Sequence, residues 1–212
     1  MKRGVDEVFY VLDTETTGVN ANLADMIEIA VLKVAKENKN RFRILDRFDQ
    51  YINPQYPLPK GIVEFNAKNK TGITDKLLSE SPTADIVLGE LKNFMQGQKP
   101  FIVGHNIISY DYKILNRTYQ KYTSREFQCR LFDTLVLARQ YKQYHHAESN
   151  KLEILFRLSE KRHSKANPNF HTAIADCCAN LDVLEYLLDI EELSGIPDWD
   201  KADRFLHCLK VK

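Results

Sequence analysis

The sequence predicts an α/β fold in which helices cover both faces of a mixed five-stranded sheet. The chain has 212 residues, 43% of them hydrophobic and 28% charged, which suits one domain with a sizeable core. Three strand patterns follow one another at the start, and helical and strand patterns alternate afterwards. Successive strands pair as an antiparallel meander, whereas strands separated by helices pair in parallel, so the chain predicts a mixed sheet.

The three early strands are rich in β-branched and aromatic residues. The first begins at Val8 and ends at two acids, and the next two cover Met26–Val34 and Arg41–Ile52. The polar segment 36–40 between them predicts a hairpin loop. Segment 53–59 carries three prolines and is expected to be irregular.

The remaining elements are expected to alternate between helix and strand, after a loop at 71–75. They are a helix from Ser81 to Gly97, a buried strand at Phe101–Gly104, a helix to Lys121, a strand at Arg130–Thr134, and helices over 135–141 and Lys151–Leu158. Residues 159–169 predict a mobile loop, and Ala173–Leu188 predicts a strongly amphipathic helix. We expect one domain over residues 1–190 and a tail, 191–212, with one short helix after Pro197.

Composition excludes several classes of protein. The formal net charge is +1, so no global basic field announces nucleic acid, although a local basic surface is compatible with that total. Four cysteines without a Cys-x-x-Cys pair argue against a zinc site and indicate a reducing compartment. No apolar signal region opens the chain, and no stretch reaches the roughly 20 apolar residues of a membrane span. We therefore expect a cytoplasmic protein that does not enter membranes.

The most informative stretch is the end of the first strand. Asp13 and Glu15 lie two positions apart, followed by Thr16, Thr17 and Gly18. Side chains two apart on a strand point to the same face, so both carboxylates are expected on one side. Two such acids repel unless a cation lies between them, and hard oxygen ligands suit Mg²⁺ or Mn²⁺. The alternative is an acidic, solvated turn.

Two further segments could complete such a site. Asp111 opens a helix just after the strand at Phe101–Gly104, and Asp176 lies in the first turns of the helix at Ala173–Leu188. Each acid alone is also explained by the helix dipole. His171 precedes Asp176 by five positions, about 140° of helical rotation, so it can act beside that acid only from a loop.

Taken together, these segments resemble the three exonuclease motifs of the DEDDh family. They are Asp13-Thr14-Glu15-Thr16-Thr17-Gly18, Gly104-His105-Asn106 with Asp111, and His171-x-x-x-x-Asp176. The likeness runs from about residue 7 to 188 and is strongest to the proofreading exonucleases of bacterial DNA polymerase III, of the epsilon and PolC types. Gly72-Ile73-Thr74 and Asp133-Thr134-Leu135 also fit that family.

The resemblance implies an RNase H-like fold and 3′→5′ hydrolysis of single-stranded DNA ends to nucleoside 5′-monophosphates. It implies that two Mg²⁺ or Mn²⁺ ions are held by four carboxylates, and that His171 is the general base. The implied ligands are Asp13, Glu15, Asp111 and Asp176. The implied substrate contacts are Thr16, Ile73, Asn106 and Tyr110, where Tyr110 stands at a position that is commonly Phe in the family.

Three alternatives follow from the same residues. An exoribonuclease acting on short RNA or tRNA ends would use the same motifs, because nothing here clearly reads a 2′-hydroxyl. A binding module on this fold should lack a metal ligand or the base, and none is missing. Whether the protein works alone or with a DNA polymerase subunit is left open.

Tyr144, His145 and His146 are expected to form an exposed helix end.

Overall fold

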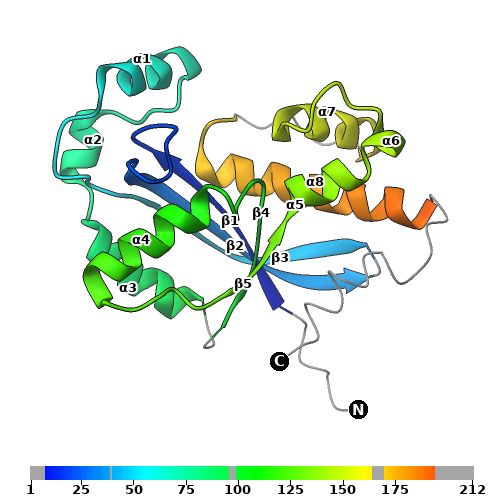
Figure 1. Ribbon diagram of the computed structural model, residues 1–212, viewed down its shortest axis with the longest axis horizontal. Helices are drawn as coiled ribbons and strands as arrows, with labels where there is room; N and C mark the ends of the chain where they lie inside the picture. The colour runs from blue at the N-terminus through cyan, green and yellow to red at the C-terminus, as the bar shows by residue number, and fades with distance from the viewer. Residues whose placement is uncertain (1–7, 39, 96–98, 164–169, 194–212) are drawn as a thin grey trace.

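A twisted five-stranded sheet lies at the centre of the fold (Figure 1). The computed structural model describes residues 8–38, 40–95, 99–163 and 170–193. The strand order is β3-β2-β1-β4-β5. The first three strands pair antiparallel, and β4 and β5 extend the sheet in parallel with β1. This confirms the mixed sheet. The strands are β1 (Val8–Thr16), β2 (Met26–Asn38), β3 (Arg41–Tyr51), β4 (Phe101–Gly104) and β5 (Arg130–Asp133).

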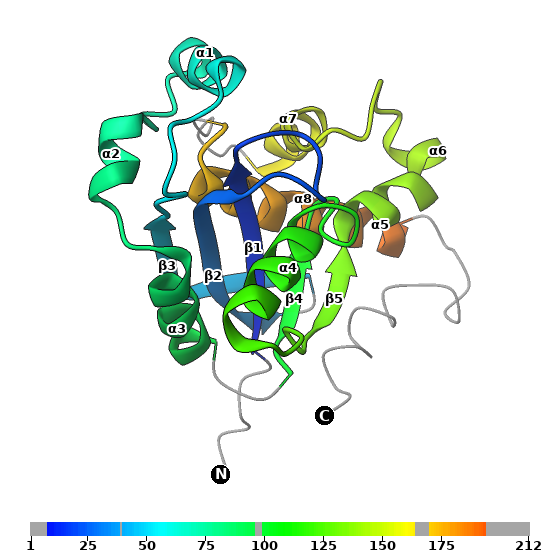
Figure 2. The ribbon, with the colours of Figure 1, turned by 60° about the vertical axis from the view of Figure 1, so that its left-hand side comes forward.

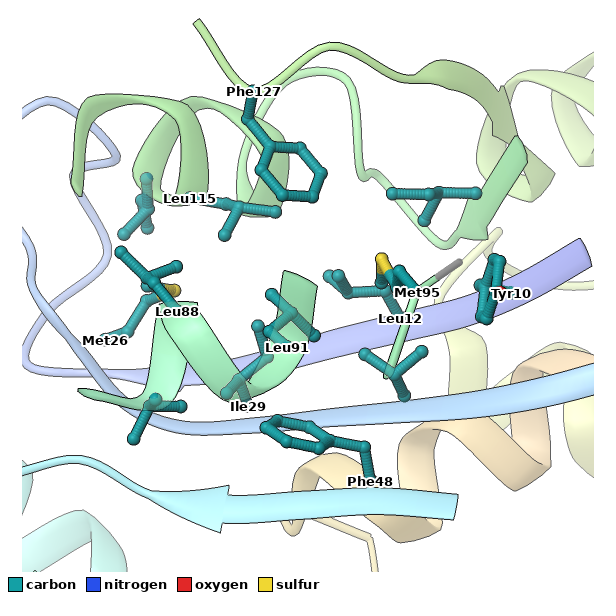
Figure 3. Packing of buried hydrophobic residues seen from close by; sticks show 14 of the residues in the cluster. Tyr10, Leu12, Met26, Ile29, Phe48, Leu88, Leu91, Met95, Leu115 and Phe127 are labelled. Atoms are coloured by element: carbon teal, nitrogen blue, oxygen red, sulfur yellow. The ribbon is translucent and has the colours of Figure 1, made fainter. Parts of the chain in front are cut away.

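Helices cover both faces of the sheet, as predicted. On one face, α3 (Ala84–Phe94) and α4 (Asp111–Thr123) pack on even-numbered residues of β1, including Tyr10 and Leu12 (Figures 2 and 3). On the other face, α8 (Ala173–Leu193) packs on odd-numbered residues, including Phe9 and Val11. The alternation of strand side chains thus assigns each residue of β1 to one of two cores.

The helix α8 is buried on two sides, which corrects the prediction that it is amphipathic. Leu181, Leu184 and Leu188 face the sheet. Val183 and Leu187 contact an outer layer made by α5 (Thr134–Gln140) and α7 (Leu152–His163). A helix between a sheet and other helices needs apolar residues all round. It also runs to Leu193, five residues beyond the predicted end.

Three further predictions about elements were wrong or incomplete. The helices α1 (Lys60–Asn69) and α2 (Asp75–Glu80), which lie on either side of the loop predicted at 71–75, were not predicted, and neither was α6 (Lys142–His145), which follows α5. The helix α7 continues through His163, so the predicted loop at 159–169 is helical in its first part. Residues 164–169 and the expected tail helix after Pro197 lie outside the described residues. Across the described residues, no helix is both long and apolar enough to cross a membrane.

Candidate metal and catalytic site

Three carboxylates meet where β1 ends. Asp13, Glu15 and Asp176 each offer an oxygen, and the three oxygens lie within 4.8 Å of one another. Asp13 and Glu15 are odd-numbered residues on the face of β1 that carries α8, and Asp176 lies in the first turn of α8. The two-residue spacing therefore aims both strand acids at the start of this helix. We call these three side chains the carboxylate cluster.

Asp111 approaches from the opposite face of β1. It is 4% exposed and begins α4. Its Oδ1 accepts hydrogen bonds from the backbone N–H of Thr14 at 3.1 Å and from the Thr14 hydroxyl at 2.7 Å. Thr14 lies between Asp13 and Glu15 and points to the α4 side, so it ties the fourth acid to the strand. Asp111 is not among the three acids whose oxygens meet, but its charge acts on both Asp13 and Glu15.

Burial and the charges of neighbouring acids raise the pKa of Asp111 and of the three acids of the carboxylate cluster. Desolvation, then the charge of Asp111, raises the pKa of Asp13 well above its ordinary value. Desolvation and the charge of Asp176 raise the pKa of Glu15 to about 8. Desolvation is also the leading cause that raises the pKa of Asp176 to about 7 and that of Asp111 to about 6. Acids gathered in this way take up protons unless a cation neutralises them.

The donor set fits hard divalent cations. Asp176 Oδ1 is buried and has no hydrogen-bond partner among the described residues, although buried carboxylate oxygens are normally satisfied. A metal ion would satisfy it. Oxygen-only ligands from carboxylates favour Mg²⁺ or Mn²⁺ over zinc or copper, which prefer nitrogen and sulfur.

His171 lies in the turn that leads into α8, as its spacing from Asp176 requires. Its backbone is left-handed, with φ of 70°, and its backbone N–H donates to the Asp176 carboxylate, which opposes the rise in that pKa. Its Nε2 lies 3.3 Å from Oε1 of Glu153 in the first turn of α7. The ring of Phe65, from α1, meets the imidazole edge to face at 5.2 Å between centroids.

Glu28, on β2, holds the start of α8 through a hydrogen bond. It pairs with Glu15 across β1 and β2, is 1% exposed, and accepts the backbone N–H of Ala173, the first residue of α8, at 3.3 Å. Desolvation raises its pKa to about 7, the Ala173 hydrogen bond opposes that rise, and neighbouring Asp49 adds to it. In the sequence, Glu28 is an acid within an otherwise apolar strand. That pattern was a signal that could have identified it.

A hydroxyl network closes the other side of the site. The hydroxyls of Thr16 and Tyr110 lie 2.6 Å apart, and both lie within hydrogen-bond distance of the Gly18 carbonyl, that of Thr16 at 2.8 Å. Because each hydroxyl has one hydrogen, one of them donates to the carbonyl and the other donates to its neighbouring hydroxyl. The hydroxyl that distinguishes Tyr110 from Phe thus fixes the turn that follows the two strand acids.

The loop before α4 is held by Asp133. Asp133 accepts the backbone N–H groups of Asn106 and Ile108 while capping α5 through Leu135. Asn106 has φ of 67°, a left-handed conformation that Asn tolerates better than most residues. Asn106 thereby orders the turn that delivers Tyr110 and Asp111. Gly104 is needed because an added Cβ would lie 2.6 Å from Cβ of Ile107.

Two expectations from the sequence differ from the structure. Ile73 is 3% exposed and packs with Ile27, Leu58 and Leu78, which argues against the predicted contact with a base. The segment Tyr144–His146 is only partly an exposed helix end. His145 is buried, with Nε2 beside the Ala138 carbonyl and Nδ1 accepting the Ala147 N–H.

The sequence reasoning missed the residues that support the site. Glu153, Phe65 and Thr14 reach the site only through tertiary contacts. Nothing in their local sequence distinguishes them from ordinary helix or strand residues. A search for acids that could pair with His171 would have returned many candidates of equal standing.

Comparison with known proteins agrees with this geometry. The family model described as Exonuclease matches residues 10–184. The DNA polymerase III PolC-type of Listeria monocytogenes is 32% identical over 203 residues, 95% of this chain and 13% of the relative. That of Halalkalibacterium halodurans is 38% identical over 135 residues, 64% of this chain and 8% of the relative. The chain thus spans about a tenth of the length of these curated relatives.

Solved structures give the same fold. E. coli Exonuclease I in complex with a dT13 oligonucleotide superposes with a TM-score of 0.71 at 18% identity, covering 95% of this chain and 45% of the other. A zinc-bound Exonuclease I–single-stranded DNA complex gives a TM-score of 0.66 at 18% identity, covering 92% and 46%. The fold is therefore RNase H-like, as expected. With the Exonuclease model matching most of its length, the chain belongs to the exonuclease family.

Proposed function

We propose that this protein is a metal-dependent 3′→5′ exonuclease that removes nucleoside 5′-monophosphates from single-stranded DNA ends. Two Mg²⁺ or Mn²⁺ ions would be held by the carboxylate cluster together with Asp111. The proposal rests above all on one observation, the meeting of carboxylate oxygens from β1 and α8 within 4.8 Å. Asp176 lies 163 positions after Asp13 and 161 after Glu15, and the electrostatic cost of bringing these acids together is relieved when they bind cations.

The site residues would have separate roles in the reaction. Asp13, Glu15 and Asp176 present their oxygens on one side, and Thr14 holds Asp111 on the other. When bound, two divalent ions would stabilise the charge that develops on the phosphate and on the leaving 3′-oxygen. His171 would accept the proton of the attacking water, a role that suits an imidazole near neutral pH. Thr16 and Tyr110, joined by their hydroxyls, would contact the terminal nucleotide.

DNA is the favoured substrate. The curated relatives are DNA polymerases, and one structural neighbour was solved with a dT13 oligonucleotide. A proofreading or repair role, with a DNA polymerase as partner, is the proposal most consistent with those relatives. The exoribonuclease alternative is tested in the same assay.

The experiment incubates the purified protein with 5′-labelled single-stranded oligonucleotides of matched DNA and RNA sequence and with primers ending in a paired or a mismatched base. With Mg²⁺ or Mn²⁺ we expect a ladder of shortened DNA products and faster loss of mismatched ends. Chelation should stop the reaction. The variant Asp13→Asn should lower the rate by at least about a thousandfold, because it removes a ligand that the reaction requires.

The matched control is Asp46→Asn, which changes an exposed acid on the edge strand β3 and should leave the rate unchanged. A ladder that survives Asp13→Asn would contradict the proposed metal site. A ladder on RNA but not on DNA would replace the substrate with RNA while keeping the mechanism.

A further inference from the structure

The side chain of His171 is contacted by two elements that come from distant parts of the chain. Glu153 of α7 lies against Nε2 at 3.3 Å, and Phe65 of α1 packs on the ring with an interplanar angle of 75°. The two helices lie on either side of the start of α8 (Figure 1). The imidazole of His171 is therefore contacted by Glu153 at Nε2 and by the ring of Phe65. The His171 and Glu153 side chains are still 33% and 37% exposed.

The contact with Glu153 has a chemical consequence. An ionised carboxylate accepts hydrogen bonds and cannot donate them, so a hydrogen bond across this 3.3 Å contact requires a hydrogen on Nε2. In a neutral imidazole the other nitrogen, Nδ1, then holds the free lone pair. A carboxylate in this position fixes both the tautomer and the direction of the ring, as in other catalytic histidines that are oriented by an acid.

Glu153 and His171 lie close to the carboxylate cluster. The charge of Glu153 is among the causes that raise the pKa of Asp176, after desolvation. The backbone N–H of His171 donates to the same Asp176 carboxylate. Glu153, His171 and the carboxylate cluster thus form one connected group, in which Glu153 contacts the histidine and is not among the acids whose oxygens converge.

We propose that Glu153 is a positioning residue, which holds His171 with Nδ1 free to accept the proton of the attacking water. The inference rests on the proposed exonuclease function. Phe65 limits rotation of the ring from the opposite helix, so the geometry is set before substrate arrives. Preorganisation of this kind affects the chemical step more than substrate binding.

The test measures single-turnover rates and apparent KM on single-stranded DNA with Mn²⁺ for Glu153→Ala, Glu153→Gln and His171→Ala. Calorimetry with Mn²⁺ alone and thermal unfolding are recorded for each variant. Glu153→Ala should lower the rate about ten- to hundredfold, below the roughly 10²–10⁴-fold contribution of a general base, with KM within about twofold. Glu153→Gln should recover part of the rate, because its amide oxygen still accepts a hydrogen bond.

The decisive arm combines the two substitutions. If Glu153 acts through His171, adding Glu153→Ala to His171→Ala should cause no further loss, whereas independent residues would give multiplied losses. Glu148→Ala is the matched control, because Glu148 is an exposed acid in the connection before α7. That variant should match the wild type.

Each other result overturns the inference in a distinct way. A loss of Mn²⁺ affinity of more than about a hundredfold in Glu153→Ala would exceed the contribution of an outer-shell residue and make Glu153 a metal ligand. A rate increase would mean that Glu153 holds His171 away from the substrate. Multiplied losses in the double variant would mean that Glu153 and His171 act independently. An inactive wild type would defeat the exonuclease function itself, whereas an active wild type with an unaffected Glu153→Ala would defeat this inference alone.

Discussion

Removing the charge of Glu15 should stabilise the protein when no metal is bound, by an amount that grows with pH. Desolvation and the neighbouring charges of Asp176 and Glu28 raise the pKa of Glu15 from its ordinary value of 4.5 to about 8. A pKa raised by folding means that the folded state holds a proton that the unfolded state releases. The corresponding stability is fully present below about pH 4.5 and is lost as the pH rises towards 8.

The magnitude follows from the linkage relation. Each pH unit in that window costs about 1.4 kcal/mol for one group, so the carboxyl of Glu15 should account for about 3 kcal/mol between pH 4.5 and 7. Coupling to Asp176 spreads part of this loss over both acids. For a chain of this size, about 3 kcal/mol corresponds to about 6–12 °C in Tm.

The assay is thermal unfolding of wild type and Glu15→Gln in chelator at about pH 5 and about pH 7.5. Glutamine resembles the protonated acid, so the two proteins should unfold together at the lower pH. At the higher pH the variant should have the higher Tm. Asp46→Asn controls for a simple change in net charge, because Asp46 is exposed on β3.

Saturating Mn²⁺ should offset most of this difference. A ligand at about 100 times its Kd stabilises a protein by about 2.7 kcal/mol, and only the wild type retains the full set of ligands. The reasoning would be refuted if Glu15→Gln were no more stable than the wild type at pH 7.5 in chelator, or if Mn²⁺ raised the Tm of both proteins equally.

Three further predictions concern the surroundings of the carboxylate cluster. Mn²⁺ binding near pH 7 should release about one proton or more, because the pKa values of Glu15 and Asp176 are about 8 and about 7 in the metal-free protein and their ligand forms are the anions. Calorimetry in two buffers of different ionisation enthalpy measures this release, and affinity that does not weaken from pH 8 to pH 6 would contradict it. At about pH 5, where a pKa raised to about 7 keeps the Glu28 carboxyl protonated in the folded protein, Glu28→Ala should destabilise the protein by about 1–3 kcal/mol in urea unfolding, because the Ala173 N–H loses its acceptor. Glu28→Gln should cost less, and equal losses would argue against the hydrogen bond. Gly104→Ala should cost about 1–3 kcal/mol through overpacking on Ile107, and the additional substitution Ile107→Gly, which removes the contacting Cβ, should show a smaller cost for the added methyl group when compared with Ile107→Gly alone.

Much of the fold was predictable because its signals are local. The β-branched and aromatic runs indicated all five strands, and their grouping along the chain indicated a mixed sheet. The helices α1 and α2 were missed because they follow a proline-rich segment and bury little surface. Their buried residues are Asn66 and Leu78, so their sequences lack a clear apolar stripe. His145 was misjudged because its burial depends on hydrogen bonds to the backbone of Ala138 and Ala147, which the pattern of residue types does not reveal.

The candidate site divides in the same way. The spacing of Asp13 and Glu15 placed them on one face of β1, since alternation is a property of any strand. The prediction that they meet Asp176 depended on the resemblance to the exonuclease motifs. The geometry of the three acids depends on the packing of α8 across that face of β1. Thr14 and Asp111 illustrate the limit, because a hydrogen bond between residues 97 positions apart has no local signal.

The sequence by itself determined which residues could carry the chemistry: two acids in register on a strand, two more at the starts of helices, and a histidine that only a turn could bring beside Asp176. The tertiary structure alone decided what surrounds them, namely Glu28 beneath the start of α8, and Glu153 and Phe65 around His171. The physical reason is that periodicity fixes directions within one element, whereas contacts between elements depend on how several helices pack against the sheet at once.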